Sequence, residues 1–219
     1  LFKLADQAIE LGVKKVRFSG GEPTLHPDIV ALVSHFSKHK VKCAMTTNGT
    51  LLDTGIGREL IEAGLHRISL SIDGHTPELH DLNVGVPGAF ERQALGIKSI
   101  RNAAAEFHTE VPITINTVVN QTNAEYLPRI VEVASAYGAQ ELVLIPIKED
   151  YLPEKMGLIG DFLARFETEI LPELLALEKM YQIHIVAMGY LRDESGYYRR
   201  VSSSFLNHAP CVCAWERLA

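Results

Sequence analysis

The stretch that decides the fold is residues 13–28, VKKVRFSGGEPTLHPD. Its first half is a short apolar run that predicts a strand over residues 13–19, and a Gly-Gly-Glu-Pro turn follows. An amphipathic helix is predicted over residues 28–40. A strand, a glycine-rich turn and a helix in this order are typical of α/β proteins with a parallel sheet.

The same order of elements returns along the chain. Three helical segments each end at a glycine, Gly12, Gly64 and Gly138, and a strand follows after a short link. The strands predicted are residues 13–19, 42–47, 69–72, 113–119, 143–145 and 183–187. Helical crossovers between strands imply parallel pairing, so the fold class is α/β, as an open doubly wound sheet or a full or partial barrel. Since the chain opens on a helix, we expect one strand before Leu1 to be missing.

The alternation of strands and helices changes after Pro146. Residues 156–181 predict a long helical stretch that Pro172 kinks or divides. Residues 189–210 are irregular and typical of a surface loop. The expected domains are therefore residues 1–188, which form the α/β core, and residues 189–219, which begin a C-terminal extension.

Composition excludes several classes of function. The chain has 219 residues, a net charge of −6 and interspersed acidic and basic residues, which disfavours nucleic acid and anionic membrane as partners. Its apolar runs are far shorter than the ~20 residues of a membrane span. Three cysteines do not make a disulfide framework, and we expect a reducing, cytoplasmic setting.

The unusual residues stand directly after predicted strands, where parallel α/β folds bind their ligands. Gly20 and Gly21 have no Cβ, so their backbone can approach a ligand closely. Asn116 interrupts an apolar strand and needs a polar partner or a ligand. Asn48-Gly49 and Asp73-Gly74 are also common turn dipeptides whose side chains can cap their own backbone.

The sequences at three of these strand ends resemble motifs of one enzyme family. GGEPTLHPD at residues 20–28 resembles the GGEP motif of radical S-adenosylmethionine (radical SAM) enzymes, and TTNGTLL at 46–52 and SLSIDG at 69–74 are similar to the strand ends that follow it. The resemblance implies a partial (β/α)6 TIM-like barrel that binds S-adenosylmethionine beside a [4Fe-4S] cluster. The cofactor-binding residues that it points to are Gly20, Gly21, Glu22, Pro23, Asn48, Ser71, Asp73 and Asn116.

Within that resemblance each segment has its own expected contact. The GGEP residues would hold the amino group of S-adenosylmethionine. Ser71 and Asp73 would face its ribose and methionine portions, and Asn116 would lie nearby. Glu22 could instead cap a local backbone amide.

The chain departs from the family in its cysteines. The loop of three closely spaced cysteines that binds the primary cluster is absent, and Cys43 is expected to be a small core residue. Cys211 and Cys213, shortly before Trp215, resemble the opening of a SPASM or twitch extension and are candidate ligands of an auxiliary cluster. A free-thiol role for both is the alternative.

The function implied is generation of a 5′-deoxyadenosyl radical that abstracts hydrogen from a peptide or small-molecule substrate, with a reductant such as flavodoxin or ferredoxin as partner. This piece alone is expected to be inactive. One rival is a cluster-free (β/α) barrel lyase or aldolase, for which Lys148, Glu149 and Asp150 could serve. Another is a non-catalytic nucleoside-binding scaffold.

Overall fold

The structure is a computed structural model that describes residues 1–146, 165–187, 190–192 and 198–200. Its strands are β1 (Lys15–Phe18), β2 (Lys42–Thr47), β3 (Leu65–Ser71), β4 (Ile113–Val119), β5 (Glu141–Pro146), β6 (His184–Ala187), β7 (Tyr190–Arg192) and β8 (Tyr198–Arg200). Its α-helices are α1 (Phe2–Glu10), α2 (Ile29–Lys38), α3 (Ile56–Glu62), α4 (Pro77–Val84), α5 (Ala89–Glu106), α6 (Leu127–Ala136) and α8 (Leu171–Tyr181). Short helical turns are η1 (Pro23–Leu25), η2 (Leu52–Thr54), η3 (Ala124–Tyr126) and the π-helix η5 (Phe166–Ile170).

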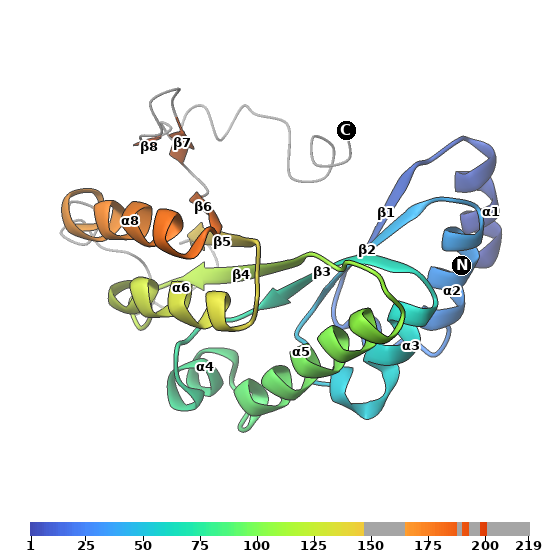
Figure 1. Cartoon of the computed structure of the whole chain (residues 1–219), viewed down its shortest axis with the longest axis horizontal. Helices are drawn as coiled ribbons and strands as arrows, with labels where there is room; N and C mark the ends of the chain where they lie inside the picture. Colours follow the sequence, from blue (N-terminus) through green and yellow to red (C-terminus); the bar gives the residue numbers. More distant parts are fainter. Residues whose placement is uncertain (147–164, 188–189, 193–197, 201–219) are drawn as a thin grey trace.

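One sheet organises the molecule. Its strands run β1-β2-β3-β4-β5-β6, each parallel to its neighbours, and the helices lie along its outer side (Figure 1). Within the described ranges no pairing joins β6 to β1, so the sheet is an arc and not a closed barrel. The predicted α/β class and partial barrel are confirmed.

The core fills the space between the sheet and the outer helices. Strand residues such as Met45, Leu70 and Ile115 and helix residues such as Leu60 and Ile130 are completely buried. Continuous burial of apolar side chains is the main favourable contribution to folding. This burial therefore determines which face of each strand points outward to the helices.

The other face of the sheet is largely polar. The register places Thr46, Ser69, Thr114, Glu141 and His184 in one row across β2 to β6. Register partners on parallel strands point to the same side, opposite to the buried set. The concave side of the arc is thus lined with groups that can hydrogen bond.

Several element boundaries differ from those expected. β3 begins at Leu65 and not at residue 69, because its ladder with β2 already pairs Leu65 and Arg67. The Arg67 side chain contacts Thr114 on the adjacent β4 and Glu141, at 3.5 Å, on β5 beyond it. In the late helical stretch the π-helix η5 passes directly into α8, and Pro172 stands in the first turn of α8, where proline is well tolerated. Residues 156–164 lie outside the described residues.

The expected irregular tail contains a two-stranded antiparallel ladder. β7 pairs with β8, from Tyr190 opposite Arg200 to Arg192 opposite Tyr198. The sequence of residues 198–200 resembles a loop, and the pairing with β7 is what makes this segment a strand. Among the described residues, no helix has the length and apolar character needed to cross a bilayer.

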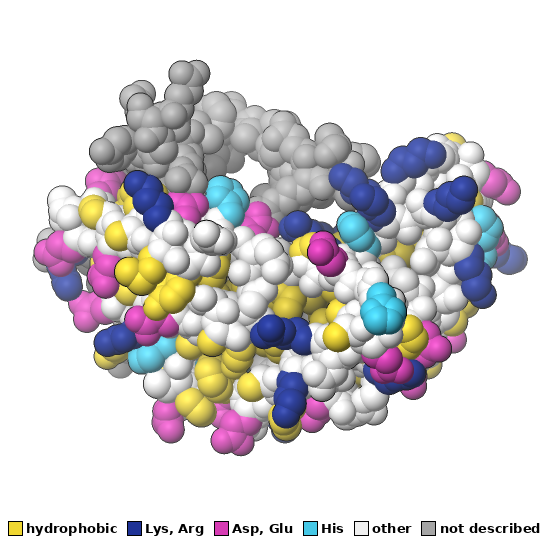
Figure 2. Space-filling model, viewed as in Figure 1, with side chains coloured by type: hydrophobic (Ala, Val, Ile, Leu, Met, Phe, Trp, Pro, Cys, Tyr) yellow, Lys and Arg dark blue, Asp and Glu magenta, His cyan; other side chains and the backbone are white. Residues whose placement is uncertain are grey.

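Acidic and basic side chains are interspersed on the face shown in Figure 2. This distribution agrees with the mixed charge pattern of the sequence. A basic stripe of the kind that neutralises nucleic-acid phosphates is not visible on this face.

Candidate functional site

The first four strands end at one edge of the sheet, and the turns that follow them meet there. Parallel strands lie about 4.8 Å apart, so the ends of β1 and β3 are separated by about 10 Å. The sequence-predicted residues of these four strand ends are therefore brought to a common edge. Gly20 and Gly21 follow β1, Asn48 follows β2, Ser71 ends β3, and Asn116 lies in β4.

Gly20 and Gly21 leave open space beside the backbone after β1. Gly20 has φ +140°, a backbone angle that residues with a side chain rarely adopt. A Cβ built on either glycine meets no atom within 4 Å, and both residues are exposed. The backbone here is consequently accessible to a ligand from the side where a Cβ would stand.

Glu22 fastens this turn to the next strand end. One carboxylate oxygen accepts hydrogen bonds from the backbone N–H and hydroxyl of Thr24 and from the Thr47 hydroxyl, at 3.1, 2.6 and 2.6 Å. The other accepts from the Asn48 backbone N–H at 2.7 Å. Both oxygens are engaged within the protein, which matches the capping alternative and makes Glu22 a residue that shapes the turn. Pro23 follows as the first residue of η1.

The Asn48 side chain is engaged in its own turn. Its Oδ1 accepts from the backbone N–H and the hydroxyl of Thr50, at 2.9 and 2.8 Å. This is the local capping that an Asn-Gly dipeptide favours. The exposed Nδ2 amide group is the part of Asn48 that a ligand could meet.

Ser71 and Asn116 are register partners on β3 and β4. Both are half-buried, and neither side chain has a hydrogen-bond partner among the described residues. Their neighbours Leu70 and Ile115 point to the core, so Ser71 and Asn116 point to the concave side. Neither side chain is among the buried unsatisfied groups of the described residues, so both stay accessible to water or to a ligand.

Asp73 stands just beyond β3 and bonds to β4. Its Oδ1 accepts from the Val118 backbone N–H at 2.7 Å, and the second oxygen has no partner in the described part of the chain. Burial raises the pKa of Asp73 to about 6, and the Val118 hydrogen bond opposes that rise. A carboxyl group with a raised pKa at the open edge of a site is a candidate for ligand contact.

A group of polar side chains that the sequence analysis did not single out holds Asp73 in place. The backbone carbonyl of Asp73 accepts from Asn83 Nδ2 at 2.8 Å and from Asn123 Nδ2 at 3.0 Å. Its backbone N–H donates to Nδ1 of the fully buried His80 at 3.0 Å. No local pattern marks Asn83, Asn123 or His80, because each acts on a turn elsewhere in the chain.

Gln93, on α5, was also missed. It is 1% exposed, and its Nε2 donates to the backbone carbonyls of Asn48 and Ser71. A buried polar group needs partners, but the burial of Gln93 is visible only once α5 is placed on the sheet, so no sequence signal marks it.

The described residues contain no cluster of three or more His, Cys, Asp or Glu side chains that could hold a metal ion. Cys43 is buried in β2, and burial raises the pKa of its thiol to about 11, which agrees with the expected core role. Cys211 and Cys213, like Lys148, Glu149 and Asp150, lie outside the described residues.

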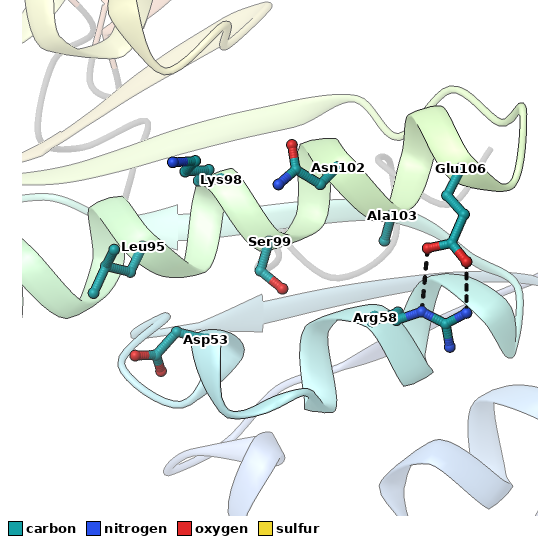
Figure 3. A pocket seen from close by; sticks show the side chains of 8 residues that line it. All are labelled: Asp53, Arg58, Leu95, Lys98, Ser99, Asn102, Ala103 and Glu106. Carbon is teal, nitrogen blue, oxygen red and sulfur yellow. Dashed lines mark hydrogen bonds and ion pairs between the residues drawn. The ribbon is translucent and has the colours of Figure 1, made fainter.

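A separate surface cavity lies between α3 and α5, lined by Asp53, Arg58, Lys98, Ser99 and Glu106 among others (Figure 3). An ion pair between Arg58 and Glu106, at 2.6 Å, closes one end of it. None of the strand-end residues lines this cavity, so it is not part of the site.

Comparisons with known proteins agree with the geometry. The model of the radical SAM superfamily matches residues 1–134, more than half of the chain. The chain belongs to the radical SAM superfamily. The core of the chain is therefore that of an enzyme, and the six-stranded arc is its partial barrel.

Two curated relatives and one structure illustrate the radical SAM likeness. AdoMet-dependent heme synthase of Methanosarcina barkeri is 37% identical over 134 residues, which are 61% of this chain and 37% of that protein. PqqA peptide cyclase of Granulibacter bethesdensis is 33% identical over 137 residues, 63% of this chain and 35% of that protein. Native anSMEcpe with bound AdoMet and Cp18Cys peptide has a TM-score of 0.63 and 19% identity, over 83% of this chain and 53% of that chain.

The chain thus spans just over a third of these curated radical SAM relatives. Its strand-end edge fits S-adenosylmethionine in chemistry, because an accessible backbone, a hydroxyl, an amide and a carboxyl group suit an amino acid joined to a nucleoside. The described residues do not supply ligands for an iron–sulfur cluster.

Proposed function

We propose that the carboxyl edge of β1 to β4 binds S-adenosylmethionine. The observation that supports this most directly is the Ser71–Asn116 pair, whose side chains lie together on the concave side without partners in the described structure. The open backbone at Gly20 and Gly21 lies two strands away, so an elongated ligand can reach both.

In this proposal each segment has one task. The backbone of residues 20–23 receives the amino group, and Glu22 keeps that turn against Thr47 and Asn48. Ser71, Asn116 and the Asn48 amide orient the rest of the molecule by hydrogen bonds. Asp73, anchored on Val118, offers its second oxygen to ribose hydroxyls.

When S-adenosylmethionine is bound beside a reduced [4Fe-4S] cluster, it supplies a 5′-deoxyadenosyl radical that abstracts hydrogen from a substrate. The residues described here would hold and orient it. Ligands for the primary cluster would come from outside the described residues.

We propose a peptide or a small molecule as the substrate. PqqA peptide cyclase and anSMEcpe with its bound peptide support a peptide, whereas the heme synthase supports a small molecule. We also propose that the protein is cytoplasmic and that a flavodoxin or ferredoxin is its electron donor. Residues 1–188 would form the core and residues 189–219 would begin an extension in which Cys211 and Cys213 help bind an auxiliary cluster.

The lyase or aldolase alternative is less favoured. Such enzymes need a lysine nucleophile or metal ligands at strand ends. The turns that follow β1 to β4 carry no lysine, and the described residues contain no metal-binding group. Membership in the superfamily points to the radical reaction instead.

The test measures S-adenosylmethionine binding and cleavage by the full-length parent protein and by two variants, each after anaerobic reconstitution with iron and sulfide. We expect cleavage to 5′-deoxyadenosine and a loss of affinity of roughly tenfold in N116A, the effect of one good hydrogen bond. The matched control is N102A, which removes an exposed asparagine of α5 and should bind like the parent. A reconstituted protein that binds neither cluster nor S-adenosylmethionine would overturn the proposal.

A further inference from the structure

Gln93 is the residue whose buried contacts the proposed function leaves unused. It lies in the second turn of α5 and belongs neither to the GGEP turn nor to any strand. Its side chain is 1% exposed, and the Nε2 group donates to Asn48 O and, at 2.8 Å, to Ser71 O. Carbonyl oxygens only accept hydrogen bonds, so the group between them has to be the NH2 and not the oxygen of the amide.

The two carbonyls belong to the neighbouring strands β2 and β3, just past the end of their ladder. The last register pair of that ladder is Thr47 with Leu70, and Asn48 and Ser71 are the next residue on each strand. One glutamine amide therefore continues the connection between the two strands after their own pairing stops. Few other side chains can do this, because it takes two N–H donors on one nitrogen.

Close packing brings the amide into reach. Gly96 lies one turn further along α5, and a Cβ there would stand 2.8 Å from Gly49 O and 2.8 Å from the Leu52 Cβ. Gly49 has φ +77°, and a Cβ added to it would lie 3.3 Å from Gln93 Cγ. The two glycines let α5 press against the turn after β2, with Gln93 at the contact.

The Oε1 oxygen of Gln93 is buried without a partner among the described residues. A buried acceptor without a donor is unfavourable for folding, and a leucine or methionine would avoid that cost. A glutamine at this position therefore contributes through its NH2 group.

Together, Glu22 and Gln93 connect the ends of β1, β2 and β3 in series, and the β3–β4 ladder extends the series to β4. Glu22 joins the turn after β1 to the Asn48 N–H, Gln93 joins Asn48 O to Ser71 O, and Ser71 stands beside Asn116. The spacing between the GGEP side and the Ser71–Asn116 side of the site depends on this series. Gln93 is the only member of it that comes from a helix.

We infer that Gln93 is a positioning residue, which sets the distance between the two halves of the proposed S-adenosylmethionine site by clamping the carbonyls of Asn48 and Ser71. The inference rests on the proposed function. Gln93 touches no ligand itself and acts through the backbone of two residues that do.

The test is Gln93→Met in the full-length protein, because methionine keeps the length and volume of the side chain and removes both donors. Binding of S-adenosylmethionine is measured by calorimetry, and its KM and kcat are measured separately. We expect affinity to fall and KM to rise by roughly tenfold, the effect of about 1.4 kcal/mol, with a much smaller change in kcat. The affinity of the Gln93→Glu variant for S-adenosylmethionine should fall at least as far, since its carboxylate would face two carbonyl oxygens.

The matched control is Ile97→Val, one turn further on α5, where a buried apolar side chain of the core loses a methyl group and no hydrogen bond is removed. Its melting temperature should fall while its affinity for S-adenosylmethionine stays at the parent value. Equal affinity in Q93M and the parent, or an equal loss in I97V, would overturn the inference. A parent protein that binds no S-adenosylmethionine would instead refute the proposed function, so the two failures are distinguishable.

Discussion

At the scale of single residues, the proposed site divides into side chains that we expect to meet the ligand and side chains that hold the turns. Ser71, Asn116 and one oxygen of Asp73 are of the first kind, and Glu22 and Gln93 are of the second. Glu22 was expected to bind the cofactor together with the glycines. Its four internal hydrogen bonds match the alternative that it caps local backbone, and the contacts with Thr47 and Asn48 of the next strand end are the part that the sequence did not predict.

Asp73 gives a pH-dependent prediction. Its folded pKa of about 6 lies above its ordinary value of 3.8, so the folded chain binds this proton more tightly than the unfolded chain does. The stabilisation from that proton is complete below pH 3.8 and is lost as the pH rises through 6. Ionised Asp73 therefore destabilises the neutral-pH protein, by about 3 kcal/mol at most.

Asp73→Asn removes that pH dependence. Asparagine keeps an oxygen for the Val118 N–H and stays neutral, so D73N should be the more stable protein at pH 7.5, and the difference should vanish near pH 4. Urea unfolding at both pH values measures this. The same variant should bind S-adenosylmethionine more weakly, whereas a gain in both stability and binding would contradict the role given to Asp73.

At the scale of elements, the strands bounded by turns were predicted best. The bounds of β2 and β4 agree with the expected residues 42–47 and 113–119, because both are short runs rich in apolar and β-branched residues with a turn on either side. The start of β3 was missed because His66 and Arg67 resemble a polar link. Arg67 is stabilised by Thr114 and Glu141, which are 47 and 74 positions further along the chain, and no local pattern records such partners.

The common edge of the site was predictable for the same reason that the sheet was. Once strands are known to be parallel, their carboxyl ends must meet, and the turns after β1 to β3 follow. The helix contributions were not predictable, because Gln93 looks like any polar position of an amphipathic helix until α5 is placed on the turn after β2.

The packing of α5 gives a stability prediction. Gly96→Ala would place a Cβ 2.8 Å from Gly49 O and from Leu52 Cβ, so α5 has to move away from the turn. We expect a loss of about 1–3 kcal/mol, although alanine favours a helix over glycine by about 1 kcal/mol. Gly21→Ala is the control, because nothing lies within 4 Å of its added Cβ.

Thermal and urea unfolding of the two variants measure the contrast. G21A should unfold like the parent and yet bind S-adenosylmethionine less well, since its methyl group enters the open space. If G96A proves as stable as the parent, the close approach of α5 to the turn is not as tight as described.

At the scale of the whole molecule, the outer edge of β1 has no strand partner among the described residues. An apolar cavity of about 420 Å³ adjoins it, lined by Leu4, Ala8, Phe18 and Phe36 among others. Leu4 is 64% exposed. Unpaired strand edges and exposed apolar patches promote association between chains.

We therefore expect the 219-residue chain to self-associate as its concentration is raised, and Leu4→Lys to weaken this. Sedimentation velocity over a range of concentrations measures the association. Leu82→Lys, which alters an equally exposed leucine on α4, should leave it unchanged. A chain that stays monomeric throughout would show that the β1 edge is protected.

The open arc of strands also bears on what the enzyme can accept. A closed barrel has a circumference that strand number and stagger fix, and hydrogen bonds all round resist any change. In the described part of this chain no bond joins β6 to β1, so the curvature can widen or narrow by small changes of twist at each strand pair. We therefore expect the width of the concave side to be an elastic property of the sheet, so that one such core could hold ligands of different size.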